Sequence, residues 1–218
     1  MTKQSKKSIF IRKPKSIILL SGGLDSTISA TIAKKKTKPI FALTFDYGQR
    51  SAKMEILAAE KICRALKIKH KLVKISFFDE FNKLVMLRAE KKVSAKKFKT
   101  LKDVWIPNRN GLFINIAACY AEYYGADLIV TGFNREEAQE FPDNTPQFVE
   151  AINTSLRYST RKKVTVMSYV EKLSKREIYK IGLQYDAPLK NIYSCYLGGK
   201  TMCGECASCQ RLKNLGIL

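Results

Sequence analysis

Short apolar runs alternate along the chain with segments in which apolar residues recur every three or four positions. The runs predict strands at residues 16–20, 39–45, 70–75 and 127–131, of which the first and the last should be buried. The recurring pattern predicts helices at residues 25–36, 52–66, 77–87, 111–124, 147–156 and 174–185. Because strands that alternate with helices form parallel βαβ units, this order predicts an α/β fold with a doubly wound, mostly parallel sheet.

The length of the chain and the breaks in this pattern divide it into parts. Its 218 residues suffice for one hydrophobic core with a small addition. We expect a basic N-terminal tail over residues 1–15, a main α/β domain over 16–190 and a small C-terminal segment over 191–218. Residues 88–103 combine many lysines with little apolar periodicity, so we expect a mobile loop there.

The strong positive charge changes the picture only in part. The chain has 40 Lys and Arg residues against 19 Asp and Glu, a formal net charge of +21. Such a surface attracts nucleic acids, but scattered lysines also keep a protein in solution, so the charge alone leaves both explanations open. No apolar run approaches the roughly 20 residues that span a bilayer, and the basic N-terminus lacks the features of a secretion signal. We therefore expect a cytoplasmic protein.

The stretch ILLSGGLDSTIS, residues 18–29, runs from a predicted strand through two glycines into a predicted helix. Gly22 and Gly23 lack side chains, so their N–H groups can approach an anion closely at the positive end of that helix. Asp25 is a candidate ligand for a magnesium ion that accompanies phosphate. Further donors to phosphate oxygens are the hydroxyls of Ser21, Ser26 and Thr27. The alternative is an ordinary glycine loop in which Asp25 only caps the helix.

Four of the six cysteines are crowded near the C-terminus: Cys195, Cys203, Cys206 and Cys209. In a cytoplasmic chain such a cluster indicates a metal ion rather than disulfides. Four thiolates around one ion form a closed tetrahedral zinc site with a structural role, so we predict one zinc ion. An iron–sulfur cluster is the main alternative, and free thiols are the other.

Polar segments follow the predicted strands, and the sheet should bring them together. SGGLDS follows the first strand, DYGQR the second, and GFNREEAQEFPDN the strand at 127–131. Because ligands bind at the carboxyl ends of parallel strands, near the point where the strand order reverses, these segments predict a single site.

The motif SGGLDS at residues 21–26 resembles the SGGxDS signature of the PP-loop ATP pyrophosphatases, whose fold is adenine nucleotide α-hydrolase-like. With FDYGQR at 45–50, IPNRNGLF at 106–113, SCYLGG at 194–199 and CGECASCQR at 203–211, the chain resembles the 7-cyano-7-deazaguanine synthases. That resemblance implies an ATP-dependent carbon–nitrogen ligase that converts 7-carboxy-7-deazaguanine and ammonia into 7-cyano-7-deazaguanine (preQ0). The carboxylate and then the amide are activated by adenylation, and each activation releases pyrophosphate and AMP. A homodimer is also implied.

The resemblance also implies roles for individual residues. Asp25, Ser26 and Arg109 would be catalytic, and the four clustered cysteines would bind zinc. ATP would contact Leu20, Ser21, Gly22, Gly23, Leu24, Asp25, Ser26, Thr27, Ile28, Ser29, Ala30 and Phe45. The deazapurine would contact Tyr47, Gln49, Arg109, Asn110, Arg135, Phe141 and Asp143. Simpler explanations remain for four of these: Asn110 as a helix cap, Tyr47 and Gln49 as turn packing, and Asp143 as a turn residue after proline.

Residues 135–144 depart from the common pattern of this family and keep only an aromatic residue, a proline and an aspartate. A related enzyme for another deazapurine therefore stays open, as does a PP-loop enzyme that thiolates tRNA, which the positive charge favours. A third alternative is a zinc-stabilised module that binds nucleic acid without catalysis.

Overall fold

A computed structural model gives the structure of the chain and describes residues 12–81, 84–87, 93–98 and 101–218. At its centre is a sheet of five parallel strands in the order β3-β2-β1-β4-β5. The strands are β1 (Lys15–Leu19), β2 (Lys38–Asp46), β3 (His70–Lys74), β4 (Leu128–Thr131) and β5 (Thr165–Ser168). The predicted α/β fold with a parallel sheet is confirmed.

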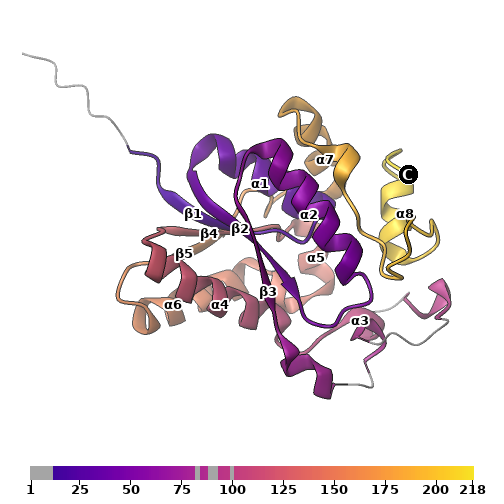
Figure 1. Ribbon diagram of the computed structural model, residues 1–218, viewed down its shortest axis with the longest axis horizontal. Coiled ribbons are helices and arrows are strands. Elements are labelled where there is room, and N and C mark those ends of the chain that lie inside the picture. Colours follow the sequence, from indigo (N-terminus) through magenta and orange to yellow (C-terminus); the bar gives the residue numbers. More distant parts are fainter. Residues whose placement is uncertain (1–11, 82–83, 88–92, 99–100) are drawn as a thin grey trace, which may run out of the picture.

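Helices cover both faces of the sheet (Figure 1). One face carries α1 (Leu24–Lys36), α2 (Ala52–Leu66) and α7 (Lys175–Gln184), and the other carries α4 (Arg109–Tyr124) and α6 (Pro146–Ser159). The chain builds β1, β2 and β3 outward in one direction and then crosses back to place β4 and β5 on the far side of β1. The strand order therefore reverses between β1 and β4, which is where a doubly wound sheet binds its ligand.

The core lies on both sides of the central strands. Ile17 and Ile18 of β1 and Ile129 and Val130 of β4 are fully buried, as expected of parallel strands covered by helices on both faces. Small residues let α4 approach the sheet closely, because its inward positions are Ala117, Ala118 and Ala121. Among the described residues, no helix is both long and apolar enough to cross a membrane.

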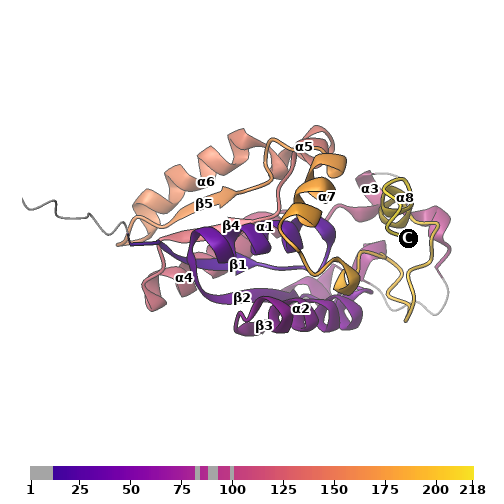
Figure 2. The ribbon, with the colours of Figure 1, turned by 90° about the horizontal axis from the view of Figure 1, so that it is seen from above.

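Shorter elements complete the carboxyl end of the sheet. They are α3 (Leu101–Val104), α5 (Arg135–Glu140), α8 (Ala207–Lys213) and several 3-10 turns. Figure 2 shows α3 and α8 beyond the carboxyl ends of β1 and β2, opposite the N-terminus. This end of the molecule therefore holds the polar segments that follow the strands.

Two predicted segments differ from the structure. The helix expected at 77–87 is instead a pair of 3-10 turns, Ser76–Glu80 and Val85–Leu87, with residues 82–83 outside the described part. Its aromatic rings explain the difference, because Phe78 is buried edge-on against Tyr47 while Phe77 stays exposed. Of the loop expected at 88–103, residues 88–92 and 99–100 lie outside the description. The remainder is packed, since Phe98 is fully buried. Of the tail expected at 1–15, residues 1–11 likewise lie outside it, and Lys15 begins β1.

Candidate active site

A cavity of about 270 Å³ opens at the carboxyl ends of β1, β2 and β4. Its floor is the glycine turn between β1 and α1, and its walls come from the ends of β2 and β4, from α4, and from the C-terminal segment that bears the cysteines. Of the residues predicted to bind ATP or substrate, it is lined by Leu20, Ser21, Gly23, Leu24, Asp25, Ser26, Phe45, Tyr47, Arg109, Asn110 and Phe141. The predicted convergence of separate motifs at one site is therefore observed.

Close backbone contacts fix the glycine turn. Gly22 has φ +85°, and a Cβ there would lie 2.9 Å from the Cβ of Ala58. At Gly132, directly after β4, a Cβ would lie 2.7 Å from the backbone nitrogen of Ser26. The backbone N–H of Tyr193 donates to the carbonyl of Gly22 at 2.9 Å. Three separate parts of the chain thus hold the turn in one position.

A buried cation lies beside this turn. Lys175 donates to the carboxylate of Asp25, and its Nζ lies 2.7 Å from a carboxylate oxygen of Glu137. Burial alone would lower the pKa of Lys175, but the two carboxylates raise it above its ordinary value. Burial raises the pKa of Asp25, whereas Lys175 keeps the pKa of Glu137 below its ordinary value despite burial. The trio carries one positive and up to two negative charges at the cavity wall.

Aromatic rings form two parts of the wall. Phe45 and Phe113 stack with centroids 4.1 Å apart and planes 11° apart. Phe141 stacks on Trp105 with centroids 6.3 Å apart and planes 6° apart. Phe45 belongs to β2 and Phe141 follows β4 and α5, so one ring of each pair comes from a different side of β1. Flat rings at two places suit a site that binds flat bases.

Between these rings lie charged groups that can bind polar edges of a ligand. The guanidinium of Arg109 lies 5.9 Å from the centre of the Tyr47 ring and donates to its hydroxyl at 3.4 Å. Burial raises the pKa of Tyr47 to about 12, so the phenol remains protonated. Arg109 also lowers the pKa of Asp143, although burial raises it overall.

Several residues predicted to contact ligand do not line the cavity. Thr27 is fully buried and its hydroxyl donates to the Gly23 carbonyl at 2.7 Å, while the Ser29 hydroxyl donates to the Thr131 carbonyl at 2.6 Å. Ile28 and Ala30 are fully buried in the core. These four positions of α1 face the sheet and α7, so their side chains are packing residues.

Three residues of the predicted substrate set likewise do not line the cavity: Gln49, Arg135 and Asp143. Gln49 is buried and braces its own turn, because its amide accepts from the Tyr47 N–H and donates to the Phe45 carbonyl. Arg135 is exposed and pairs with Glu177 at 3.1 Å. Asp143 stands behind the wall, where its carbonyl accepts from Asn110 at 3.4 Å. Asn110 is in the first turn of α4, and Asn108 is its N-terminal cap residue.

The wall also contains seven residues that were not predicted from the sequence: Glu55, Glu137, Lys175, Tyr193, Ser194, Tyr196 and Arg211. Glu55 is a buried carboxyl that accepts from Ser51 at 2.6 Å and Gln49 at 2.9 Å, and burial raises its pKa. Three of the seven lie in motifs quoted above, since Ser194 and Tyr196 belong to SCYLGG and Arg211 ends CGECASCQR. Lys175 also had a sequence signal, for its position though not for its role. Ser174 and Glu177 form a capping box, which places Lys175 at the first position of a helix that follows a strand.

The four clustered cysteines form a candidate metal centre behind the C-terminal wall. Their sulfur atoms all lie within 4.8 Å of one another, and those of Cys203 and Cys209 are 3.8 Å apart. Backbone N–H groups point at the sulfurs: Cys203 accepts from Glu205 and Cys206 at 3.4 and 3.3 Å. A hydrogen bond from Cys206 lowers the pKa of Cys195 to about 4, although burial opposes it. The arrangement can hold a metal ion.

Comparison with known proteins identifies the family. The family described as Queuosine biosynthesis protein QueC matches residues 15–215. The chain belongs to the QueC family. The resemblance seen in its motifs is therefore confirmed.

Curated relatives from bacteria and archaea support the assignment. A protein of Carboxydothermus hydrogenoformans named 7-cyano-7-deazaguanine synthase is 45% identical over 91% of this QueC chain and 96% of its own length. The protein of that name from Methanosarcina mazei is 38% identical over 93% of this chain and 95% of its own length.

Solved structures share the fold at low identity. The U34-tRNA thiolase NcsA of Methanococcus maripaludis, with its [4Fe-4S] cluster, has a TM-score of 0.54 at 17% identity over 96% of this QueC chain and 68% of its own. A 4-thiouridine synthetase bound to RNA and ATP has a TM-score of 0.50 at 22% identity, over 93% of this chain and 50% of its own.

Proposed function

We propose that the chain converts 7-carboxy-7-deazaguanine, ammonia and ATP into 7-cyano-7-deazaguanine, the product for which its relatives are named. The observation that carries the proposal is the cavity, where a glycine turn, a buried lysine and two aromatic stacks meet in a member of this family. In the reaction, the carboxylate attacks the α-phosphate and pyrophosphate leaves. Ammonia displaces AMP to give an amide, and a second adenylation removes the amide oxygen.

The glycine turn and Lys175 are suited to the phosphates. The start of α1 presents backbone N–H groups and its positive end toward the cavity, and Ser21 and Ser26 add hydroxyls beside Gly23. The Lys175 ammonium lies on the same wall, where it would stabilise the negative charge that grows on the leaving pyrophosphate. Its hydrogen bonds to the carboxylates of Asp25 and Glu137 keep this ammonium protonated and in place, although it is buried.

The residues also fit a magnesium ion. One carboxylate oxygen of Asp25 is buried and has no hydrogen-bond partner among the described atoms. An unsatisfied carboxylate oxygen beside a phosphate site is the kind of ligand that Mg²⁺ takes. Asp25 would hold the ion, which when bound neutralises phosphate charge. Asp25 is therefore assigned to the ATP site on geometry as well as on its motif.

We assign zinc to the four cysteines. Zinc–sulfur bonds of about 2.3 Å in a tetrahedron place the sulfurs roughly 3.8 Å apart, and Cys203 and Cys209 have that separation. Four protein ligands leave no open position, so the role is structural: the ion would stabilise residues 191–218 against the main domain at 16–190. The resemblance further implies a homodimeric, cytoplasmic enzyme.

The deazapurine is assigned to the side of the cavity formed by Phe141, Arg109 and Asn110. Phe141 offers a flat ring backed by Trp105, and Arg109 offers donors to the substrate carboxylate. Adenine is assigned to the opposite side, beside Phe45. In this arrangement the glycine turn lies between the two bases, where the α-phosphate must meet the carboxylate.

Mass spectrometry of the purified chain with 7-carboxy-7-deazaguanine, ATP, magnesium and ammonium tests the proposal. We expect AMP and the 7-cyano base to appear together. The Asp25→Ala variant should remain folded by circular dichroism and form neither. Absence of both products from folded, metal-bearing wild-type protein would overturn the proposal and direct attention to another acceptor for the adenylate.

A further inference from the structure

A group of exposed basic side chains lies at the edge of the sheet opposite the cavity. There the strands begin, and α1, α2, α4 and α6 end. We call this the amino-edge face and define its basic part by the exposed side chains of Lys13, Lys34, Lys35, Lys36, Lys38, Arg64, Lys67, Lys69, Arg157, Arg161, Lys162 and Lys163. A reaction between small molecules at the other end of the sheet gives these residues no role.

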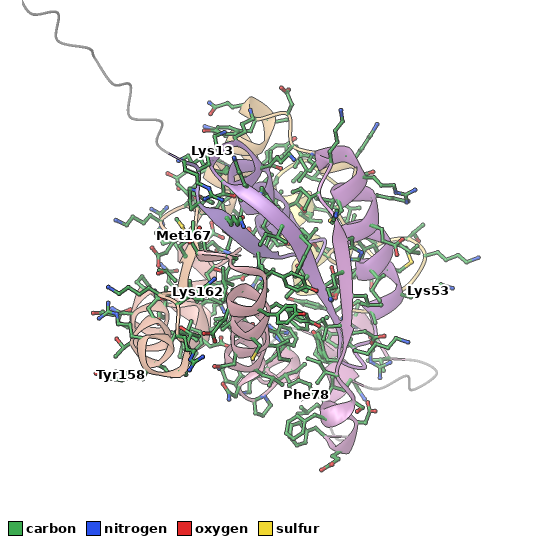
Figure 3. The ribbon with its side chains drawn as sticks, turned by 60° about the vertical axis from the view of Figure 1, so that its left-hand side comes forward. Lys13, Lys53, Phe78, Tyr158, Lys162 and Met167 are labelled. Carbon is green, nitrogen blue, oxygen red and sulfur yellow. The ribbon has the colours of Figure 1, made fainter. Side chains whose placement is uncertain are left out.

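Contacts between neighbouring loops, which join the helices to the next strands, make the amino-edge face continuous. The ammonium of Lys13 donates to the Lys35 carbonyl at 2.6 Å, and that of Lys34 donates to the Lys67 carbonyl at 3.1 Å. Lys162 lies near the end of α4, because a Cβ on Gly125 would be 3.3 Å from its ammonium. Figure 3 brings this face forward, and the labelled side chains of Lys13, Tyr158 and Lys162 point outward along it.

The acidic groups on this face do not neutralise the lysines. Asp127 accepts a hydrogen bond from the Lys15 backbone at 2.8 Å, and Glu122 accepts one from the Arg161 backbone at 2.6 Å. Within the described part of the chain, no ion pair joins a carboxylate to the lysines of the amino-edge face. Their charge is therefore available to an external anion.

Exposed aromatic rings lie among these charges. Tyr123 in the last turn of α4 is 82% exposed, and Tyr158 in the last turn of α6 is 89% exposed. One turn before Tyr123 in α4, the centre of the Tyr120 ring lies 4.6 Å from the Lys71 ammonium. Lysines attract phosphates and exposed rings stack on unpaired bases, which is how single strands are bound without regard to sequence.

We propose that the amino-edge face binds a single-stranded nucleic acid, with the lysines along the phosphates and Tyr123 and Tyr158 stacked on bases. An anionic membrane would also meet the lysines. It is the weaker fit, because binding at a membrane surface takes a helix with a continuous apolar face of residues such as Trp, Phe and Leu. Here the exposed rings are two single tyrosines in the last turns of different helices. The face lies at the opposite end of the strands from the cavity, so both can be occupied together.

Fluorescence anisotropy with labelled oligouridine and oligodeoxythymidine strands tests the proposal in the full chain. The charge variant replaces Lys67, Lys69, Lys162 and Lys163 with Ala, and the ring variant is Tyr123→Ala with Tyr158→Ala. A control variant replaces the exposed Lys53, Lys74, Lys96 and Lys97, which lie away from this face, with Ala. We expect micromolar binding by wild type, since non-specific binding commonly has a Kd of roughly 1–100 μM.

The charge variant should bind at least about tenfold more weakly, with a salt slope less steep by roughly two to three, because each lost phosphate contact removes about 0.7. The ring variant should bind at least roughly 30-fold more weakly at an unchanged slope, because each lost stacking contact costs about 1–3 kcal/mol. The control variant should resemble wild type. Equal loss in the control, no loss in the ring variant, or binding to phosphatidylserine vesicles but not to oligonucleotides would each overturn the proposal.

Discussion

The ammonium of Lys175 donates to the carboxylate of Asp25, although 150 residues separate them in the sequence. One residue begins the helix after β5 and the other begins the helix after β1. Both helices start at the carboxyl end of the sheet, so the parallel topology brings the two charges together. The site therefore depends on sheet order as much as on its glycine motif.

Lys175→Met should abolish AMP formation and also destabilise the protein. It leaves Asp25 and Glu137 close together without a cation, and loss of one partner from a buried charge pair costs about 3–5 kcal/mol. We expect the free energy of unfolding in urea to fall by about that much and the rate of AMP formation to fall at least about 100-fold.

Adding Asp25→Asn to Lys175→Met separates the two effects. The double variant should regain part of the lost stability, because only Glu137 and no longer Asp25 is left as an unpaired carboxylate, yet it should remain inactive. Lys180→Met, an exposed change in the same helix, is the matched control and should behave as wild type. Full activity in Lys175→Met would remove Lys175 from the mechanism.

Cys206→Ser should lower bound metal, melting temperature and ATP affinity together. The cysteine segment supplies Tyr193, Ser194 and Arg211 to the cavity wall, so loss of the metal should release that wall. Metal analysis, thermal unfolding and ATP titration measure the three effects. Cys119→Ser, at an exposed cysteine outside the cluster, should change none of them. Unchanged zinc content in Cys206→Ser would refute the assignment of four ligands.

Gly132→Ala should prevent ATP binding while leaving most of the core intact. The new Cβ would lie 2.7 Å from the Ser26 nitrogen, so the end of β4 and the glycine turn must separate. Gly216→Ala is a useful comparison, because Gly216 has φ +71° but no atom within 4 Å of an added Cβ. It should cost stability through backbone strain alone and bind ATP normally in calorimetric titration.

Phe141→Leu should raise the KM for the deazapurine about tenfold or more, through the lost stacking, without changing that for ATP. Trp105 is the only tryptophan of the chain, and its ring stacks on Phe141, so its fluorescence reports this side of the cavity. Addition of 7-carboxy-7-deazaguanine should change the emission of wild type. Phe45→Leu is the control, and there the KM for ATP should rise instead. Equal effects on both substrates would contradict the separation of the two bases.

Glu55 should make stability fall as the pH rises. Burial raises its pKa in the folded protein, so between the ordinary value of 4.5 and the raised value the folded state holds a proton that the unfolded state has lost. The free energy of unfolding then decreases with pH, by at most about 1.4 kcal/mol per unit from this group. Glu55→Gln removes the titration. In urea unfolding from pH 4.5 to 8, the free energy of unfolding of Glu55→Gln relative to that of wild type should increase as the pH rises. A difference that stays constant with pH would contradict this.

Local pattern predicted the strands well. The structure places β1, β2, β3 and β4 within one residue of the expected ends, because each is an apolar run between polar turns. The strand β5 was missed because in its four residues, TVMS, only Val166 is fully buried. Such a short edge strand has no periodicity to detect. The helix expected at residues 77–87 did not form, because burial of Phe78 outweighed the helical preference of the local sequence.

Individual site residues could be predicted only where they lie in a short sequence motif. Asp25, Ser26, Arg109 and Phe141 were named from short patterns, and all four lie on the cavity wall. Lys175, Glu137 and Glu55 could not be named, because their role comes from burial and from partners far away in the sequence. Arg135 was misplaced for the same reason, since Glu177 holds it at the surface.

The hydrogen bond from Tyr193 to Gly22 also means that the glycine turn is completed late during synthesis of the chain. A ribosome makes β1 and the glycine turn early, and β5 and α7 follow, so the sheet can fold as the chain emerges. The turn keeps an unpaired carbonyl until residue 193 has been made and docked. A chain halted at residue 190 would possess the nucleotide fold without the finished cradle, so ATP turnover should begin only once the cysteine segment has left the exit tunnel.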